Sequence, residues 1–75
     1  MHRLWFEQKD SEWRIYLEGR DKPIGSIFSQ ANGEWWGEMS LDGHRAARPG
    51  GTPDVIIDDF ESWVAAGMPP REIII

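Results

Sequence analysis

The sequence predicts an α+β domain, a four-stranded antiparallel β-meander with one C-terminal amphipathic helix packed on one face. Two observations lead to this prediction. Alternating apolar and polar residues, interrupted by turn pairs such as Asn32-Gly33, fill the first half of the chain. A hydrophobic period of helical type follows over residues 53–66. The 75 residues show no internal repeat and no shift in composition, so residues 1–75 are expected to form a single domain.

The strands are expected over about residues 3–9, 12–18, 24–30 and 34–41. Because alternate side chains of a strand point to opposite faces, the first, second and fourth strands each separate an apolar face from a mixed one. The apolar face comprises Leu4, Phe6, Trp13, Ile15, Leu17, Trp35 and Met39. The facing of the third strand stays ambiguous. Asn32-Gly33 predicts a hairpin with a primed turn, since both residues tolerate positive φ.

The segment that follows the fourth strand is basic and then rich in glycine. Asp42-Gly43 is expected to end that strand. Residues 44–51 predict a flexible crossover to the helix, with a short fifth strand at residues 44–47 as the alternative. After the helix, residues 71–75 are either an edge strand or a tail. Three exposed terminal isoleucines, Ile73, Ile74 and Ile75, would favour aggregation, so docking within the fold or across a dimer is expected.

The helix has both of its end signals. Thr52 is a suitable N-cap whose hydroxyl can accept a hydrogen bond from the first turn, and Pro53 suits the first helical position. Gly67 suits the left-handed position after the last turn, and Pro69-Pro70 cannot continue a helix. At 100° per residue, one side is apolar and the other acidic. The apolar side holds Ile56, Ile57, Phe60, Trp63 and Val64.

Composition restricts the classes of function. A net charge of −5 disfavours direct binding to nucleic acid and favours a basic protein partner. The absence of cysteine excludes disulfides and thiolate metal sites and fits a cytoplasmic location. No run of apolar residues has the length of a signal peptide core or a membrane span. We therefore expect a soluble cytoplasmic protein without a membrane association.

The sequence favours a protein that is not an enzyme. His44, near Asp42 and Arg45 in a predicted turn, is the best catalytic candidate, but no serine lies in a nucleophile elbow. Two histidines without thiols do not make a metal site. The stretch from Pro49 to Thr52 lacks the lysine and the spacing of a nucleotide-binding loop. No catalytic residue, cofactor or metal is predicted.

Two surfaces are candidates for binding a partner. The first is an acidic ridge on the helix, formed by Asp54, Asp58 and Glu61, with Asp59 at its flank. Residues 53–66 contain four acids and no lysine or arginine, so the helix itself offers these acids no partner. The second is the sheet face opposite the helix, where alternation places Trp5, Tyr16 and Trp36. Tryptophan and tyrosine supply much of the energy at interface centres. Ordinary solvated charge and cross-strand packing are the competing interpretations.

The order of several residues resembles a small meander-plus-helix layout. These residues are Trp13, Gly19, Ile24-Gly25-Ser26-Ile27, Trp35, Asp42-Gly43 and Phe60-Glu61-Ser62-Trp63-Val64. Short proteins of phages and mobile elements often have this layout, and some anti-CRISPR inhibitors are similar in size and acidity. Arm-binding domains of phage integrases share the layout but bind DNA through a basic sheet, and this acidic chain departs from them. The resemblance implies a fold and a class of inhibitor, and it assigns no functional residue.

The leading hypothesis is a small non-enzymatic protein-binding module, specifically an acidic inhibitor of a basic partner that binds nucleic acid. A phage-encoded anti-defence protein is an inhibitor of this kind. One alternative is a homo-oligomeric or scaffold module, a homodimer for example, that uses the exposed aromatic sheet face. A second alternative is a DNA- or RNA-binding domain. An enzyme centred on His44 ranks below these.

Overall fold

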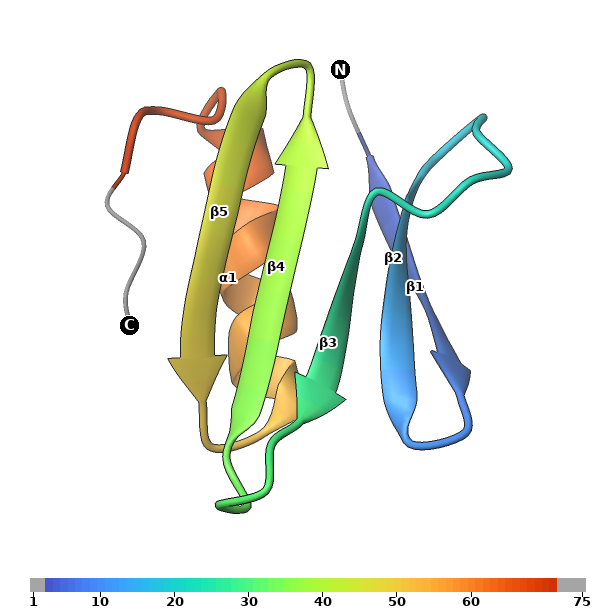
Figure 1. The fold of residues 1–75 in the computed structure, drawn as a ribbon. Coiled ribbons are helices and arrows are strands. Elements are labelled where there is room, and N and C mark those ends of the chain that lie inside the picture. The colour runs from blue at the N-terminus through green and yellow to red at the C-terminus, as the bar shows by residue number, and fades with distance from the viewer. Residues whose placement is uncertain (1–2, 72–75) are drawn as a thin grey trace.

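The structure is a computed structural model and describes residues 3–71. A single sheet contains all the strands, which are β1 (Leu4–Lys9), β2 (Glu12–Leu17), β3 (Gly25–Ser29), β4 (Trp35–Leu41) and β5 (His44–Gly50). Their order in the sheet is β1-β2-β3-β4-β5, and every neighbouring pair is antiparallel. One helix, α1 (Pro53–Ala65), follows the last strand (Figure 1). The predicted α+β meander with a C-terminal helix is therefore confirmed.

The prediction of four strands was wrong, because residues 44–50 form β5 and not a flexible crossover. Asp42 and Gly43 have φ values of 51° and 82°, the conformation of a two-residue primed turn. Such a turn matches the twist of the sheet and sends the chain straight back along β4, with Leu41 opposite His44 and Trp35 opposite Gly50. Pro49 is tolerated in β5 because this strand lies at the edge of the sheet.

The hairpin predicted at Asn32-Gly33 is present, but its turn is not of the primed type. Gly33 has a φ of 85°, whereas Asn32 does not have a positive φ. The Gly33 amide donates to the Gln30 carbonyl, and the Gln30 amide donates to the Glu34 carbonyl. The Asn32 side chain accepts a hydrogen bond from the Glu34 amide at 3.0 Å. This side-chain bond stabilises a longer connection in which Gly33 alone takes the left-handed conformation.

The helix begins and ends close to the predicted residues. Pro53 occupies the first turn, but the Thr52 hydroxyl makes no capping hydrogen bond, so that expected contact was wrong. Pro53 has no amide, which leaves one donor fewer to satisfy at this end. At the other end the Met68 amide donates to the Trp63 carbonyl and the Gly67 amide to the Val64 carbonyl, with Gly67 at a φ of 89°. This pair of bonds is a Schellman motif, and the left-handed conformation predicted for Gly67 is confirmed.

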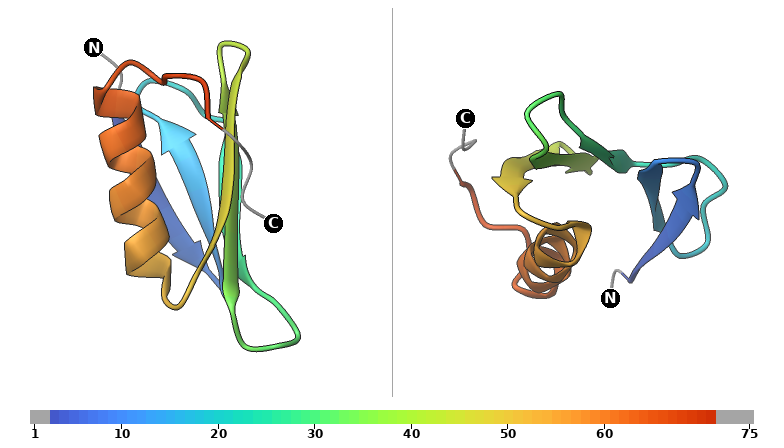
Figure 2. Two further views of the ribbon diagram at one scale, coloured as in Figure 1. Left: turned by 90° about the vertical axis from the view of Figure 1, so that its left-hand side faces the viewer. Right: turned by 90° about the horizontal axis from the view of Figure 1, so that it is seen from below.

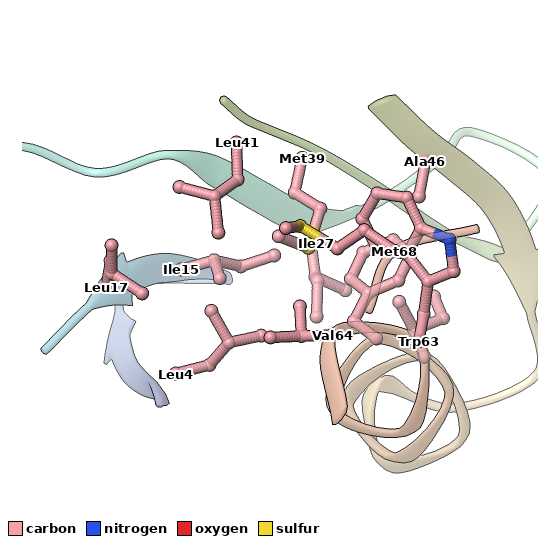
Figure 3. Close-up of a cluster of buried hydrophobic side chains, with 12 residues drawn as sticks. Leu4, Ile15, Leu17, Ile27, Met39, Leu41, Ala46, Trp63, Val64 and Met68 are labelled. Carbon is pink, nitrogen blue, oxygen red and sulfur yellow. The ribbon is translucent and has the colours of Figure 1, made fainter. Parts of the chain in front are cut away.

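The core lies between α1 and one face of the sheet, which we call the inner face (Figures 2 and 3). Ile15, Ile27, Leu41, Ile56 and Phe60 are its largest fully buried side chains. The third strand, ambiguous in the sequence, turns Ile27 inward and leaves Phe28 half-buried. Gly37 lets the helix approach β4, since a Cβ there would overlap the Ile56 side chain. The apolar face predicted from alternation is thus the face that α1 covers.

The helix covers only part of this curved sheet. It packs on β3, β4 and β5, and the β1–β2 hairpin continues the curve beyond it (Figure 2). Within residues 3–71, no helix combines the length and apolarity that a membrane span requires. The isoleucines Ile73, Ile74 and Ile75, for which docking was predicted, lie outside the described residues.

Candidate functional site

The acidic ridge faces solvent on the side of α1 that points away from the sheet. Asp54, Asp58 and Glu61 fall within about 60° of one another around the helix axis, and all three are exposed. Among residues 3–71, none of the three takes part in an ion pair. The helix itself offers these acids no lysine or arginine, and the rest of residues 3–71 adds no ion pair to them.

Asp59 differs from the ridge, because its carboxylate is neutralised within the fold. It turns toward β5, where Arg48 Nη1 lies 3.6 Å and Arg71 Nη2 3.1 Å from Asp59 Oδ2. Arg71 Nη2 also donates to Oδ1 at 3.3 Å. The Arg71 guanidinium lies over the Trp63 ring, 5.9 Å from its centroid, and the Trp63 indole donates to the Pro69 carbonyl at 2.8 Å. We call this group of residues the Asp59 cluster, and it joins the end of α1 to β5.

The three aromatic residues predicted for the face opposite the helix, here called the outer face, do lie there, but they are not equally exposed. Trp5 and Tyr16 pair across β1 and β2, and their rings stack at 4.2 Å with 8° between the planes. Trp5 is 42% exposed, while Tyr16 is 8% exposed. Tyr16 lies outside the buried cluster that contacts α1, so its neighbours on the outer face cover it. As a contact residue, Tyr16 can only support Trp5.

Trp36 belongs to a separate part of the outer face. It is half-buried between Phe28 and Pro49 on the neighbouring strands, and its indole donates to Glu38 at 3.2 Å. The pairing register places Trp36 beside the row that contains Glu12, four residues along β2 from Tyr16, which corresponds to about 13 Å. The outer face therefore offers one exposed aromatic, Trp5, rather than a continuous aromatic patch.

The ridge and the outer face lie on opposite sides of the molecule. The helix covers the inner face of the sheet (Figure 2). The ridge lies on the exposed side of the helix, opposite its buried residues, with Glu61 at the border toward β1. A partner that contacts the ridge therefore does not touch Trp36 unless it wraps around an edge of the sheet. The structure does not bring the six predicted contact residues into one site.

A feature that the sequence did not reveal lies beside the ridge. Because the sheet curves away from α1, a groove of about 940 Å³ runs between the start of β1 and the last turns of the helix. Leu4, Leu17 and Val64 form its apolar floor, and Figure 3 shows Leu4 and Leu17 at one end of the core, with Val64 on the helix between Leu4 and Trp63. Its rim comprises Arg3, Glu18, Glu61, Ala65 and Gly67. Only the curvature of the sheet reveals the groove, and strand alternation carries no signal for curvature.

The remaining candidate, His44, is an exposed residue at the start of β5. It follows the turn in which Asp42 pairs with Arg20 at 3.7 Å. In the described part of the chain, no three histidine or acidic side chains converge as the ligands of a metal ion would. The structure adds no neighbouring group to the catalytic hypothesis for His44, which stays untested.

Comparison with known proteins gives no relative: the chain matches no family model, no curated protein and no solved structure.

Proposed function

We propose that this chain is a non-enzymatic protein-binding module whose acidic ridge contacts a basic partner. The observation that carries the proposal is the contrast among the four acids of α1. Asp59 has two arginines against it, whereas Asp54, Asp58 and Glu61 are exposed and have no cationic partner within residues 3–71. Adjacent carboxylates without counter-charges produce a local negative potential, which speeds association with a basic surface and orients it.

The specific form of the proposal is an inhibitor. A row of carboxylates competes with phosphates for a basic nucleic-acid-binding surface, and the net charge of −5 adds to this competition. An anti-defence protein of the kind that phages encode would act in this way. The proposed partner is a protein that loses its nucleic acid when this chain binds.

The test uses charge reversal with a matched control. Asp58→Lys with Glu61→Lys changes the net charge by +4, and so does Asp21→Lys with Glu34→Lys, at exposed positions in two turns outside α1. Each immobilised variant is used to capture proteins from a lysate at low and at high salt. The proposal expects the ridge variant to lose basic proteins that the wild type and the control variant retain, and that capture weakens with salt. Equal capture by all three proteins would show that the ridge is not a contact surface.

A second candidate function has one observation in its favour. Trp5 is 42% exposed although it is a large apolar side chain, and it is held rigidly by its stack on Tyr16. Rigid exposed aromatics are frequent at interface centres, which supports a homo-oligomeric module that uses the outer face. Light scattering at increasing protein concentration separates the two functions, since this candidate requires a mass above that of the monomer and the basic-partner proposal does not.

A further inference from the structure

We propose that Asn32 is a site of spontaneous covalent modification in the folded protein, where its side chain cyclises onto the Gly33 nitrogen, releases ammonia and takes up water. The product is aspartate or isoaspartate in the connection between β3 and β4. Asn32 is the sole asparagine of the chain. This inference does not rest on the proposed function, because no residue of the acidic ridge and none of the aromatic candidates takes part in the reaction.

The reaction needs only the groups at these two residues and water. The Gly33 nitrogen loses its proton to hydroxide or to a water molecule and attacks Cγ of Asn32. The new N–Cγ bond closes a five-membered succinimide, the bond from Cγ to Nδ2 breaks, and Nδ2 leaves as ammonia. Water then opens the ring at either carbonyl, which restores the main chain as aspartate or redirects it through the side chain as isoaspartate. Glycine favours the attack because no Cβ hinders its nitrogen.

The connection between β3 and β4 leaves both reacting groups open to water. Residues 31–34 are all exposed, and the connection projects beyond the end of the sheet (Figure 1). The Asn32 side chain is directed toward the following residues, since its Oδ1 accepts a hydrogen bond from the Glu34 amide at 3.0 Å. This donor draws electron density from Cγ and stabilises the negative charge that Oδ1 gains during the attack. The structure thus holds a polarised carbonyl one residue before an unhindered nitrogen.

One hydrogen bond has to open before the nitrogen can attack. The Gly33 amide donates to the Gln30 carbonyl at 3.0 Å, and the Gln30 amide donates to the Glu34 carbonyl at 2.7 Å. Both bonds lie within this exposed connection, and none of the residues 31–34 belongs to the buried core. Opening of so short and exposed a segment costs much less free energy than global unfolding. The turn therefore slows the reaction relative to an unfolded chain without preventing it in the folded protein.

The second turn with an acceptor followed by glycine, Asp42-Gly43, provides an internal comparison. The Oδ1 atom of Asp42 lies 3.7 Å from Arg20 Nη2, and a paired, ionised carboxylate is a poor electrophile without a neutral leaving group. This turn is also tighter, because its two residues have φ values of 51° and 82° and are flanked directly by paired residues of β4 and β5. The structure therefore assigns the reaction to Asn32 and not to Asp42.

Modification changes both the charge and the backbone of the connection. Each conversion adds one negative charge to a chain whose net charge is −5. Aspartate keeps an oxygen that can accept from the Glu34 amide, whereas isoaspartate adds a methylene carbon to the main chain and moves this acceptor out of place. The change falls on the adjacent end of the sheet, where Trp35 pairs with Ser29 and Gly50. Isoaspartate should therefore speed amide exchange in these pairs before it affects the rest of the sheet.

The test follows the full chain in native buffer at neutral and at mildly alkaline pH. Cleavage after glutamate places residues 32 and 42 in different fragments, because Glu34 and Glu38 lie between them. Mass spectrometry of the fragments detects the exchange of an amide NH2 for OH, and methyl transfer by an isoaspartyl methyltransferase counts isoaspartate.

Two references separate the folded protein from the unfolded chain. The chain unfolded in concentrated urea gives the rate without structure, and lower urea concentrations, below the unfolding transition, raise the unfolded population by a known factor. Asn32→Gln is the matched control for the site, since its longer amide side chain could close only a six-membered ring.

The proposal expects residue 32 to convert in the folded protein at a rate that rises with pH and lies below the rate of the unfolded chain. Urea below the transition should leave this rate unchanged, because a local opening exposes little surface. Each converted molecule shifts by one charge unit toward the acidic side in isoelectric focusing. The fragment with Asp42 should contain no isoaspartate, and Asn32→Gln should show no conversion over the same period.

Three outcomes would overturn the proposal. The first is a folded protein that stays unmodified while the unfolded chain converts completely. The second is a rate that rises with urea in proportion to the unfolded population, which would assign the reaction to unfolded molecules alone. The third is isoaspartate that forms at residue 42 as fast as at residue 32.

Discussion

The two edge strands of the sheet, β1 and β5, have similar lengths but differ in their outward backbone groups and in their contacts with α1. At β5, Pro49 lacks an amide, its carbonyl accepts from Arg48, and Arg48 is held in turn against Asp59 of the helix. At β1, the Glu18 amide donates to the Arg3 carbonyl, and the alternation of hydrogen-bonded pairs directs the backbone groups of Leu4, Phe6 and Gln8 away from β2. The β5 edge is joined to the helix, whereas a groove separates the β1 edge from it. The β5 side of the sheet is therefore held to α1 by both packing and charge, and the β1 side is not.

The largest expected effect is at Gly37 in β4, where α1 packs against the sheet. Gly37→Ala places a Cβ where the Ile56 side chain packs, and both Ile56 and its neighbour Phe60 are fully buried. Since neither side chain can move to solvent, we expect a loss of about 3 kcal/mol in the free energy of unfolding, at the upper end of the cost of overpacking. Urea unfolding measures it. A loss below about 1 kcal/mol would mean that α1 packs less tightly against β4 than the close approach of Ile56 to Gly37 indicates.

The Asp59 cluster should give the next largest effect. Asp59→Ala leaves Arg48 and Arg71 without their shared carboxylate, and we expect a loss of about 1–2 kcal/mol in the free energy of unfolding. The control is Asp58→Ala on the exposed ridge, for which the change should stay within about 0.5 kcal/mol. Thermal and urea unfolding of both variants check the difference. If the two substitutions cost the same, the cluster does not stabilise the β5 side.

On the β1 side of the sheet, we expect substitutions of Trp5 to lower the free energy of unfolding, because its ring stacks on Tyr16 across the β1–β2 pair. Trp5→Ala removes this stack and part of the cover of Tyr16, so we expect a loss of about 1 kcal/mol. Trp5→Phe keeps an aromatic ring and should recover most of it. Hydrogen exchange provides the sharper measurement, because the loss should appear in β1 and β2 and leave β4 and β5 unchanged. Faster exchange throughout the sheet would contradict the independence of the two sides.

Much of this arrangement follows from sequence patterns, and the exceptions have physical causes. Alternation identified the inner face, and Gly67 marked the end of the helix, because both depend on local geometry. The sequence interpretation offered a fifth strand only as a short alternative at residues 44–47, since glycine and proline near residue 50 suggested a loop. The decisive signal for the full length of β5 was the turn at Asp42-Gly43. Curvature of a sheet depends on packing between distant residues, so neither the groove nor the pairing of Asp59 with Arg71 could be predicted.

The same limit applies to the candidate contact residues. Asp54, Asp58 and Glu61 could be predicted as one surface because the helical period fixes their directions. The aromatic set could be assigned to a face but not to a patch, since the distance from Tyr16 to Trp36 depends on the pairing register of three strands. Register also decides which backbone groups of β1 point outward, and the sequence alone did not provide it.

The smallest effect is expected at Pro49, where the comparison between edges is most direct. Pro49→Thr adds an outward amide to β5 without removing a bond from the β4–β5 ladder, since Trp36 and Pro49 are not a hydrogen-bonded pair. The greater freedom of the unfolded chain should cost about 0.4–1 kcal/mol. The new amide should exchange as fast as those of Phe6 and Gln8, which NMR hydrogen exchange can measure. Slow exchange at residue 49 would mean that other chain segments cover this part of β5, and that the edge strands do not differ there in the way proposed.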